Sequence, residues 1–139
     1  MTYGKTVATR LALCATLAAA SACGSDSPTA PGGGGGAGTG SPGPVGATIT
    51  IGANDTVSPA SVTINPGESV MFVNNGSQAH EMASDPHPAH TDCPPLNAVG
   101  LLNPQQSRAS NALTTSRTCG YHDHRNDTSA GLRGSVVIR

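Results

Sequence analysis

Aromatic residues are almost missing from this chain of 139 residues, which has one Phe, two Tyr and no Trp. The core of any domain must therefore rest on Val, Ile, Leu and Ala, and a bound metal or a disulfide is a natural supplement to so small a core. Basic residues are also few: Lys5 is the one lysine, and the arginines are scattered. Without a basic stripe, the sequence argues against nucleic acid as a partner.

No apolar run is long enough to span a bilayer, which takes about 20 residues. The short stretch 11–22 consists of Leu, Ala, Thr, Ser and Cys, and it follows a basic start with Lys5 and Arg10. It ends in small residues, Ala-Ser-Ala at 20–22. A basic start, a short apolar segment and a small-residue cleavage site predict a secretory signal peptide over residues 1–22, and therefore export.

Cys23 comes directly after these small residues. The arrangement resembles the lipobox of bacterial lipoproteins, in which this cysteine becomes the lipidated first residue of the mature protein. Ala20 stands where that family more often has Leu. The resemblance implies a lipid at Cys23 and a protein anchored to a membrane of the periplasm or cell envelope. The alternative is ordinary cleavage nearby, without a lipid.

Residues 23–46 are composed mostly of Gly, Ser, Pro, Thr and Ala, and residues 32–36 are all Gly. Such a segment cannot bury enough apolar surface to offset its conformational entropy, so we expect a disordered, flexible linker. The remaining residues, 47–139, then form one small domain.

Short strand patterns separated by turns run through this domain, and no window has an apolar stripe at helical spacing. Asn65, Pro66 and Gly67 indicate a tight turn between two of them. The expected strands are 47–51, 62–64, 70–73, 107–113, 116–119 and 132–138. The pattern predicts an all-β fold, an antiparallel β-sandwich.

Cys119 and His122 lie three positions apart shortly before the last expected strand, and His80 lies about forty residues earlier. One thiolate and two imidazoles form the trigonal set of a blue-copper electron-transfer site. These donors suit both Cu(I) and Cu(II), so the metal can change oxidation state with little rearrangement. We therefore predict a mononuclear copper site with His80, Cys119 and His122 as ligands.

The order of these motifs resembles a plastocyanin-like cupredoxin. The residues that carry the resemblance are 57–59 (Val-Ser-Pro), 62–75 (Val-Thr-Ile-Asn-Pro-Gly-Glu-Ser-Val-Met-Phe-Val-Asn-Asn) and His80, followed by Cys119 and His122. In that family a strand, a Pro-Gly turn and a second strand deliver the first copper histidine. The resemblance covers most of 47–139 and implies a Greek-key β-sandwich, one bound copper ion and redox partner proteins.

Members of that family commonly have an axial Met about five residues after the second histidine, and this chain has none there. Candidate axial ligands are His124, Asp127, a backbone carbonyl or Met82, which shares a strand face with His80 if the chain is extended. An oxygen or nitrogen donor would favour Cu(II) and lower the potential. Asp123 could instead contact the imidazole of a ligand histidine and orient it, without binding the metal itself.

The segment after His80 has three more potential ligands, His87, His90 and Cys93, at intervals of three residues and among prolines. Three hypotheses stay open. Cys93 pairs with Cys119 in an oxidising compartment, which leaves an imidazole-rich copper site. Alternatively, the three join Cys119 or His122 around zinc, although the spacing fits no common zinc motif. Finally, the segment folds over a thiolate copper site, with its histidines exposed.

The sequence thus predicts a copper protein rather than an enzyme, one that transfers single electrons between partners at the cell envelope. Copper storage or delivery is a close variant, because histidines are in excess around the site. A copper oxidoreductase is another class, but no substrate pocket or nucleophile motif is recognisable. A metal-free binding or structural domain is the remaining class, and a disulfide at Cys119 would favour it.

Overall fold

The computed structural model describes residues 40–139. The predicted signal peptide, the predicted lipid site at Cys23 and most of the predicted linker lie outside the described residues. Within them, no helix is both long enough and apolar enough to cross a membrane. The strands are β1 (Val45–Ile51), β2 (Val57–Ser58), β3 (Ser61–Ile64), β4 (Ser69–Asn74), β5 (His80–Ser84), β6 (Gly100–Leu102), β7 (Ser107–Ala109), β8 (Arg117–Asp123) and β9 (Arg133–Ile138).

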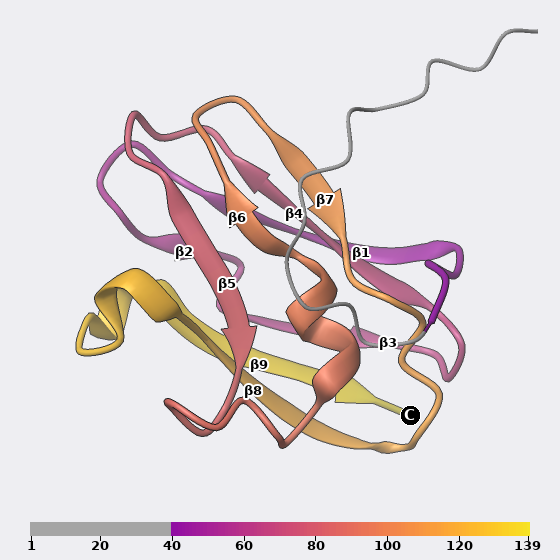
Figure 1. Ribbon diagram of the computed structural model, residues 1–139. Helices are drawn as coiled ribbons and strands as arrows, with labels where there is room; N and C mark the ends of the chain where they lie inside the picture. The colour runs from indigo at the N-terminus through magenta and orange to yellow at the C-terminus, as the bar shows by residue number, and fades with distance from the viewer. Residues whose placement is uncertain (1–39) are drawn as a thin grey trace, which may run out of the picture. The chain divides into compact units, whose positions relative to one another are not determined.

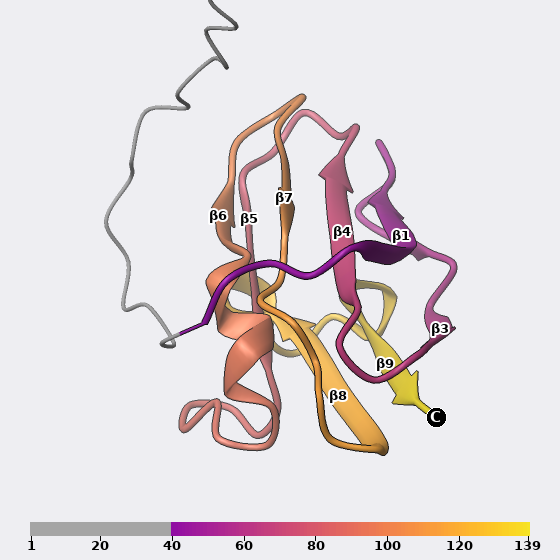
Figure 2. The same cartoon turned by 90° about the vertical axis from the view of Figure 1, so that its right-hand side faces the viewer.

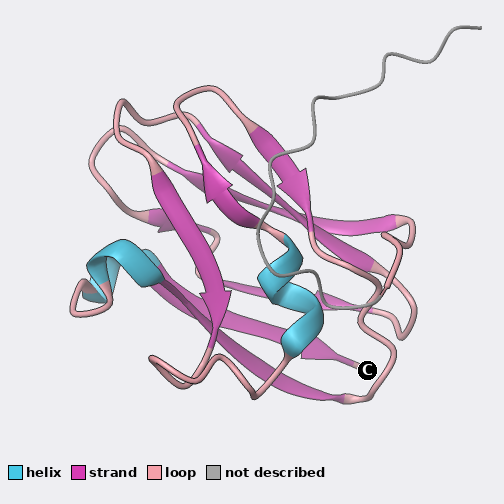
Figure 3. Ribbon diagram, in the orientation of Figure 1, coloured by secondary structure: helices cyan, strands magenta, loops and turns pink. Residues whose placement is uncertain are grey.

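Helix is limited, in this described part, to three short 3-10 turns: η1 (Pro94–Ala98), η2 (His124–Asn126) and η3 (Ala130–Leu132). Figure 3 shows these strands joined by loops, with helix at η1 and at the neighbouring η2 and η3. These short turns agree with the prediction that no window of the domain has an apolar stripe at helical spacing. The turn between β3 and β4 is also as predicted, with Gly67 at a φ of 92°, a conformation that glycine adopts without strain.

The strands form two sheets, in the orders β2-β1-β4-β7 and β3-β9-β8-β5-β6, which can be followed from two directions in Figures 1 and 2. The predicted all-β sandwich is confirmed, but the sheets are mixed rather than wholly antiparallel. β1 pairs with β4 in parallel, and β3 pairs with β9 in parallel. Between β1 and β4 the chain crosses to the other sheet and back, and such a crossover allows parallel pairing where a hairpin does not.

Two segments differ from the predicted strand boundaries. The first strand begins at Val45, and Gly43 N donates to Ser69 Oγ at 2.7 Å, so ordered structure reaches into the segment predicted as linker. The expected strand at 116–119 is longer, because β8 continues to Asp123 beside β5 and β9. This extension decides which way the side chains of β8 point.

The space between the sheets is filled mainly by Val, Ile and Leu side chains, as the composition predicts. The two aromatic rings of the described chain, Phe72 and Tyr121, meet edge to face with centroids 5.2 Å apart. Burial raises the pKa of the Tyr121 hydroxyl, which donates to Ala60 O at 3.1 Å. The fully buried members of the core include Ile49, Ile51, Val70, Val99, Leu102 and Val136.

Successive side chains of β8 point to opposite faces of its sheet, as in any strand. Cys119 and Tyr121 lie on the inner face and belong to the apolar core, together with Met82 of β5. Gly120 and His122 alternate with them and therefore lie on the outer face. The inner face of β8 therefore packs in the apolar core, whereas its outer face carries the imidazole of His122.

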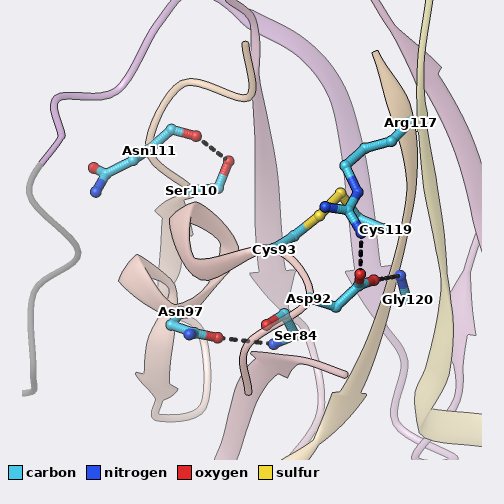
Figure 4. The surroundings of a disulfide bond; sticks show 9 residues. All are labelled: Ser84, Asp92, Cys93, Asn97, Ser110, Asn111, Arg117, Cys119 and Gly120. Atoms are coloured by element: carbon cyan, nitrogen blue, oxygen red, sulfur yellow. Dashed lines mark hydrogen bonds and ion pairs between the residues drawn. A yellow bond between two sulfur atoms is a disulfide. The ribbon is translucent and has the colours of Figure 1, made fainter. Parts of the chain in front are cut away.

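A disulfide joins Cys93, just before η1, to Cys119 of β8, with their Cα atoms 5.8 Å apart. Both residues are almost completely buried. Figure 4 shows the bond close to Asp92, which forms an ion pair with Arg117 and accepts from Gly120 N at 3.4 Å. Of the three hypotheses for Cys93, the pairing with Cys119 is the one that the structure bears out.

We predict that replacing both half-cystines, as Cys93→Ala with Cys119→Ala, lowers the free energy of unfolding of the metal-free protein by about 3 kcal/mol. The bond closes a loop between residues 26 apart in sequence, and opening that loop restores conformational freedom to the unfolded chain. Urea unfolding monitored by circular dichroism measures the change, with the oxidised wild type as reference. A loss below about 1 kcal/mol would contradict this role.

Candidate metal centre

The loop 85–92 follows β5 and is closed on itself by backbone hydrogen bonds. Asp92 N donates to Asp85 O at 2.8 Å, and His90 N donates to Pro86 O at 2.8 Å. At its start, Asp85 N donates to Gly120 O at 3.1 Å, so the loop lies alongside β8 where β5 has ended. The disulfide fastens the chain to β8 again directly after the loop. A short loop held at both ends can present side chains in a defined arrangement.

Four imidazoles meet against this loop, and we call them the four-histidine cluster. His87 and His90 come from the loop, His122 from β8, and His124 from the first position of η2. One nitrogen of each can be chosen so that all four lie within 4.8 Å of one another. Four imidazole nitrogens brought this close together from three separate segments could hold a metal ion.

The four histidine side chains of the cluster differ in their exposure to solvent. The side chain of His122 is 1 % exposed and forms the base, whereas that of His87 is 32 % exposed and lies at the mouth. His90 and His124 are partly buried between them. An ion or a partner molecule would therefore approach from the His87 side.

The orientation of His122 is set by a carboxylate. Its Nδ1 lies 2.7 Å from Asp85 Oδ1. A carboxylate can only accept, so Nδ1 carries the proton and Nε2 presents a lone pair. That Nε2 is buried and has no hydrogen-bond partner among the described residues. A buried lone pair without a partner is costly, and a bound cation would satisfy it.

His90 and His124 also contact each other directly, with His90 Nε2 at 3.1 Å from His124 Nδ1. The pKa of His90 is lowered, first by burial and then by the positive charges that His124, His122 and His87 can carry. A lowered pKa keeps the ring neutral, the form in which imidazole binds metals. His90 also has a φ of 51°, an uncommon conformation for a residue other than glycine.

The predicted trigonal set is not assembled in this structure. Cys119 is a half-cystine and has no thiolate to offer, and it lies on the inner face of β8. His122, three residues further along an extended strand, lies on the opposite face. The predicted strand ended at Cys119, which left His122 outside it, but β8 continues through both residues.

His80 is separate from the cluster as well. It is buried, and its Nδ1 donates to Asp123 Oδ2 at 2.8 Å. Its Nε2 lies 3.5 Å from Asp55 Oδ1. Met82, a predicted axial candidate, is buried in the apolar core. Asp123 thus orients an imidazole, as predicted, but this imidazole is that of His80 rather than of a cluster member.

Of the other predicted metal ligands, some belong to the four-histidine cluster and some do not. His124 is a full member of the cluster, together with both loop histidines, while Asp127 Oδ2 lies 3.7 Å from His87 Nε2 and is outside the group. Cys93 is oxidised and cannot act as a thiolate ligand to zinc. The zinc hypothesis, which required Cys93, therefore does not apply to the oxidised chain.

Sequence reasoning missed one contributor, Asp85, which it placed in the loop without a role. It also ranked His124 only as an axial candidate. One signal was available for the latter: residues two apart share a face of an extended strand, so His122 and His124 could have been paired from their spacing. Nothing comparable in the sequence joins Asp85 to His122, since 37 residues separate them.

Comparison with known proteins gives relatives that match about two thirds of the chain, although no family model matches it. A plastocyanin of Ulva prolifera is 26 % identical over 98 residues, 67 % of this chain and 99 % of that protein. A plastocyanin of Scenedesmus fuscus is 29 % identical over 97 residues, covering 66 % and 98 % of the two chains. The solved purple cupredoxin of Nitrosopumilus maritimus superposes with a TM-score of 0.53 at 17 % identity, over 67 % of this chain and 99 % of that one.

We predict that the metal-free protein loses stability as the pH falls below about 6.5, the ordinary pKa of histidine. In the unfolded chain His90 takes up a proton near that pH, whereas in the folded protein it does so at lower pH, so unfolding consumes a proton in this window. The contribution is fully present above pH 6.5 and is lost as the pH falls through the lowered folded pKa.

Urea unfolding at a series of pH values, with a chelator present, measures this slope. The variant His90→Gln should show a shallower dependence on pH than the wild type. An unchanged slope in that variant would show that His90 does not carry the effect.

Proposed function

We propose that this plastocyanin-like cupredoxin domain binds one copper ion through the four-histidine cluster and transfers single electrons. The observation that carries the proposal is the convergence of one nitrogen from each of the four imidazoles within 4.8 Å, and the buried Nε2 of His122, without a hydrogen-bond partner among the described residues, supports it. The donors fit the ion, because neutral imidazole is a common ligand of copper. The cluster replaces the predicted trigonal set and corresponds to the imidazole-rich alternative with a disulfide.

Copper is favoured over other imidazole-binding metals by two arguments. Among divalent first-row metals, a given nitrogen site binds copper most tightly. The sequence and fold also resemble those of plastocyanin-like cupredoxins, a family of copper proteins. With the thiol of Cys119 oxidised, the centre would be a type 2 site, without the thiolate that gives blue-copper centres their colour.

When bound, copper supplies one-electron chemistry, and the protein residues supply a fixed site near the surface. The disulfide and the closed loop hold His87 and His90 against β8, which restricts rearrangement when the charge of the ion changes. His87, the exposed ligand, offers the shortest route for an electron to a redox partner protein. We place the protein outside the cytoplasm, exported by its leader and anchored through a lipid at Cys23.

Copper storage or delivery is a second candidate, and the exposure of His87 favours it. A ligand that is one-third exposed can leave the ion and admit a competing donor from another molecule. Four imidazoles without a thiolate also hold Cu(I) less tightly than a site with a soft sulfur ligand does. Both candidates share the same ligands and differ in what happens on reduction.

We predict that the purified protein binds one Cu(II) with a weak visible spectrum and no intense thiolate-to-copper band. His122→Ala should weaken binding by more than about 100-fold, since the loss of a ligand costs more than the loss of its supporting contact. The control is His80→Gln, because His80 is the one histidine of the chain outside the cluster. A blue protein that needs His80 and Cys119 would overturn the proposal in favour of the trigonal set.

Reduction of the loaded protein separates the two candidate functions. We predict that Cu(I) stays bound after treatment with ascorbate in the presence of a Cu(I) chelator, and that re-oxidation restores the original paramagnetic resonance spectrum. Retention supports electron transfer. Rapid loss of Cu(I) to the chelator would contradict it and support copper delivery.

A further inference from the structure

Asp85 contacts His122, the most buried histidine of the cluster, through the ring nitrogen Nδ1. Its Oδ1 accepts from His122 Nδ1 at 2.7 Å, which leaves Nε2 as the lone-pair nitrogen. We propose that Asp85 is the positioning residue of the metal centre, and that Gly120 exists to make room for it. This inference rests on the proposed metal-binding function and deepens it.

The hydrogen bond from His122 to Asp85 does more than orient the ring. A carboxylate that accepts from the far nitrogen of a metal-binding imidazole fixes its tautomer and strengthens the near nitrogen as a donor. His122 is the most buried ligand, 1 % exposed, while the Asp85 side chain is 45 % exposed. The carboxylate of Asp85 therefore keeps contact with solvent on one side while its other side holds the ring.

The backbone keeps Asp85 in place independently of the metal. Its N–H donates to Gly120 O, and its carbonyl accepts from Asp92 N, so the residue is fixed at the point where the loop opens and closes. Asp85 thus follows β5 directly beside β8. It lies opposite Gly120, two residues along the ladder from the pair of Ala83 with His122.

Gly120 supplies the space for the carboxylate. A Cβ at position 120 would lie 2.1 Å from Asp85 Oδ2 and 2.9 Å from Asp85 Cγ, closer than any real contact. Gly120 does not have a positive φ, so its small size rather than its conformational freedom is what the structure uses. An alanine there would push away the end of the Asp85 side chain, which can move, and leave the backbone in place.

The neighbouring carboxylates have other partners. Asp92 pairs with Arg117 and contacts Gly120 N, and Asp123 binds His80 on the inner face. Asp127 lies 3.7 Å from His87, beyond hydrogen-bond distance, at the exposed mouth of the cluster. Among the residues that the structure describes, Asp85 is therefore the carboxylate placed to orient a buried ligand.

The test compares Asp85→Ala, Asp85→Asn and Gly120→Ala with the control Asp92→Asn, which alters a carboxylate of the same loop that contacts no imidazole. Cu(II) affinity is measured by competition with a chelator. Asp85→Ala should lower the Cu(II) affinity by about 10- to 100-fold. Gly120→Ala should also lower the affinity, although all four histidines are still present. The Cu(II) affinity of Asp85→Asn should lie between those of the wild type and Asp85→Ala, because an amide oxygen accepts a hydrogen bond but carries no charge.

A second readout is independent of copper. In the metal-free wild type, nitrogen NMR should report His122 with its proton on Nδ1, and in Asp85→Ala and Gly120→Ala the two tautomers should mix. Thermal unfolding of the metal-free variants verifies that they are folded. A single Nδ1–H tautomer in all variants, or copper affinity of Asp85→Ala within about twofold of wild type, would overturn the inference. A wild type that shows the tautomer signature but binds no copper would instead overturn the proposed function.

Discussion

The covalent bond between Cys93 and Cys119 is the constraint on which the rest of the site depends. Cys93 follows the closed loop with His87 and His90, and Cys119 precedes His122 on β8. The bond therefore holds together two chain segments that each carry half of the cluster. It also uses the one thiol that a blue-copper site would need. One interaction thus both builds the imidazole site and excludes the thiolate site.

The second determinant is the length of β8. Because the strand continues to Asp123, its residues alternate between the apolar core and the outer face through the whole motif. Cys119 and Tyr121 contribute to packing, and Gly120 and His122 to the metal site. The candidate metal centre thus lies on the outer face of this sheet, opposite the apolar core. The fold resembles that of a solved cupredoxin.

The loop histidines and Asp85 show how the scaffold and the centre support each other. The carboxylate that orients His122 comes from the loop that also supplies two ligands, and the missing side chain of Gly120 lets that loop lie close to β8. The exposed His87 leaves the centre accessible on one side, while the buried His122 anchors it on the other. This grading suits an ion that must be held firmly and still exchange electrons with a partner.

The sequence by itself determined the all-β sandwich, because alternation of apolar residues and the Asn65-Pro66-Gly67 turn are local signals that short-range geometry obeys. It also pointed to the histidines as candidate metal ligands, because imidazole is a common ligand of copper. Tertiary structure alone decided their grouping. Whether Cys119 met His80 or Cys93 depended on the continuation of β8 and on the path of a loop, and both follow from strand pairing between residues far apart in the chain. Asp85 and His122, 37 residues apart, became partners for the same reason.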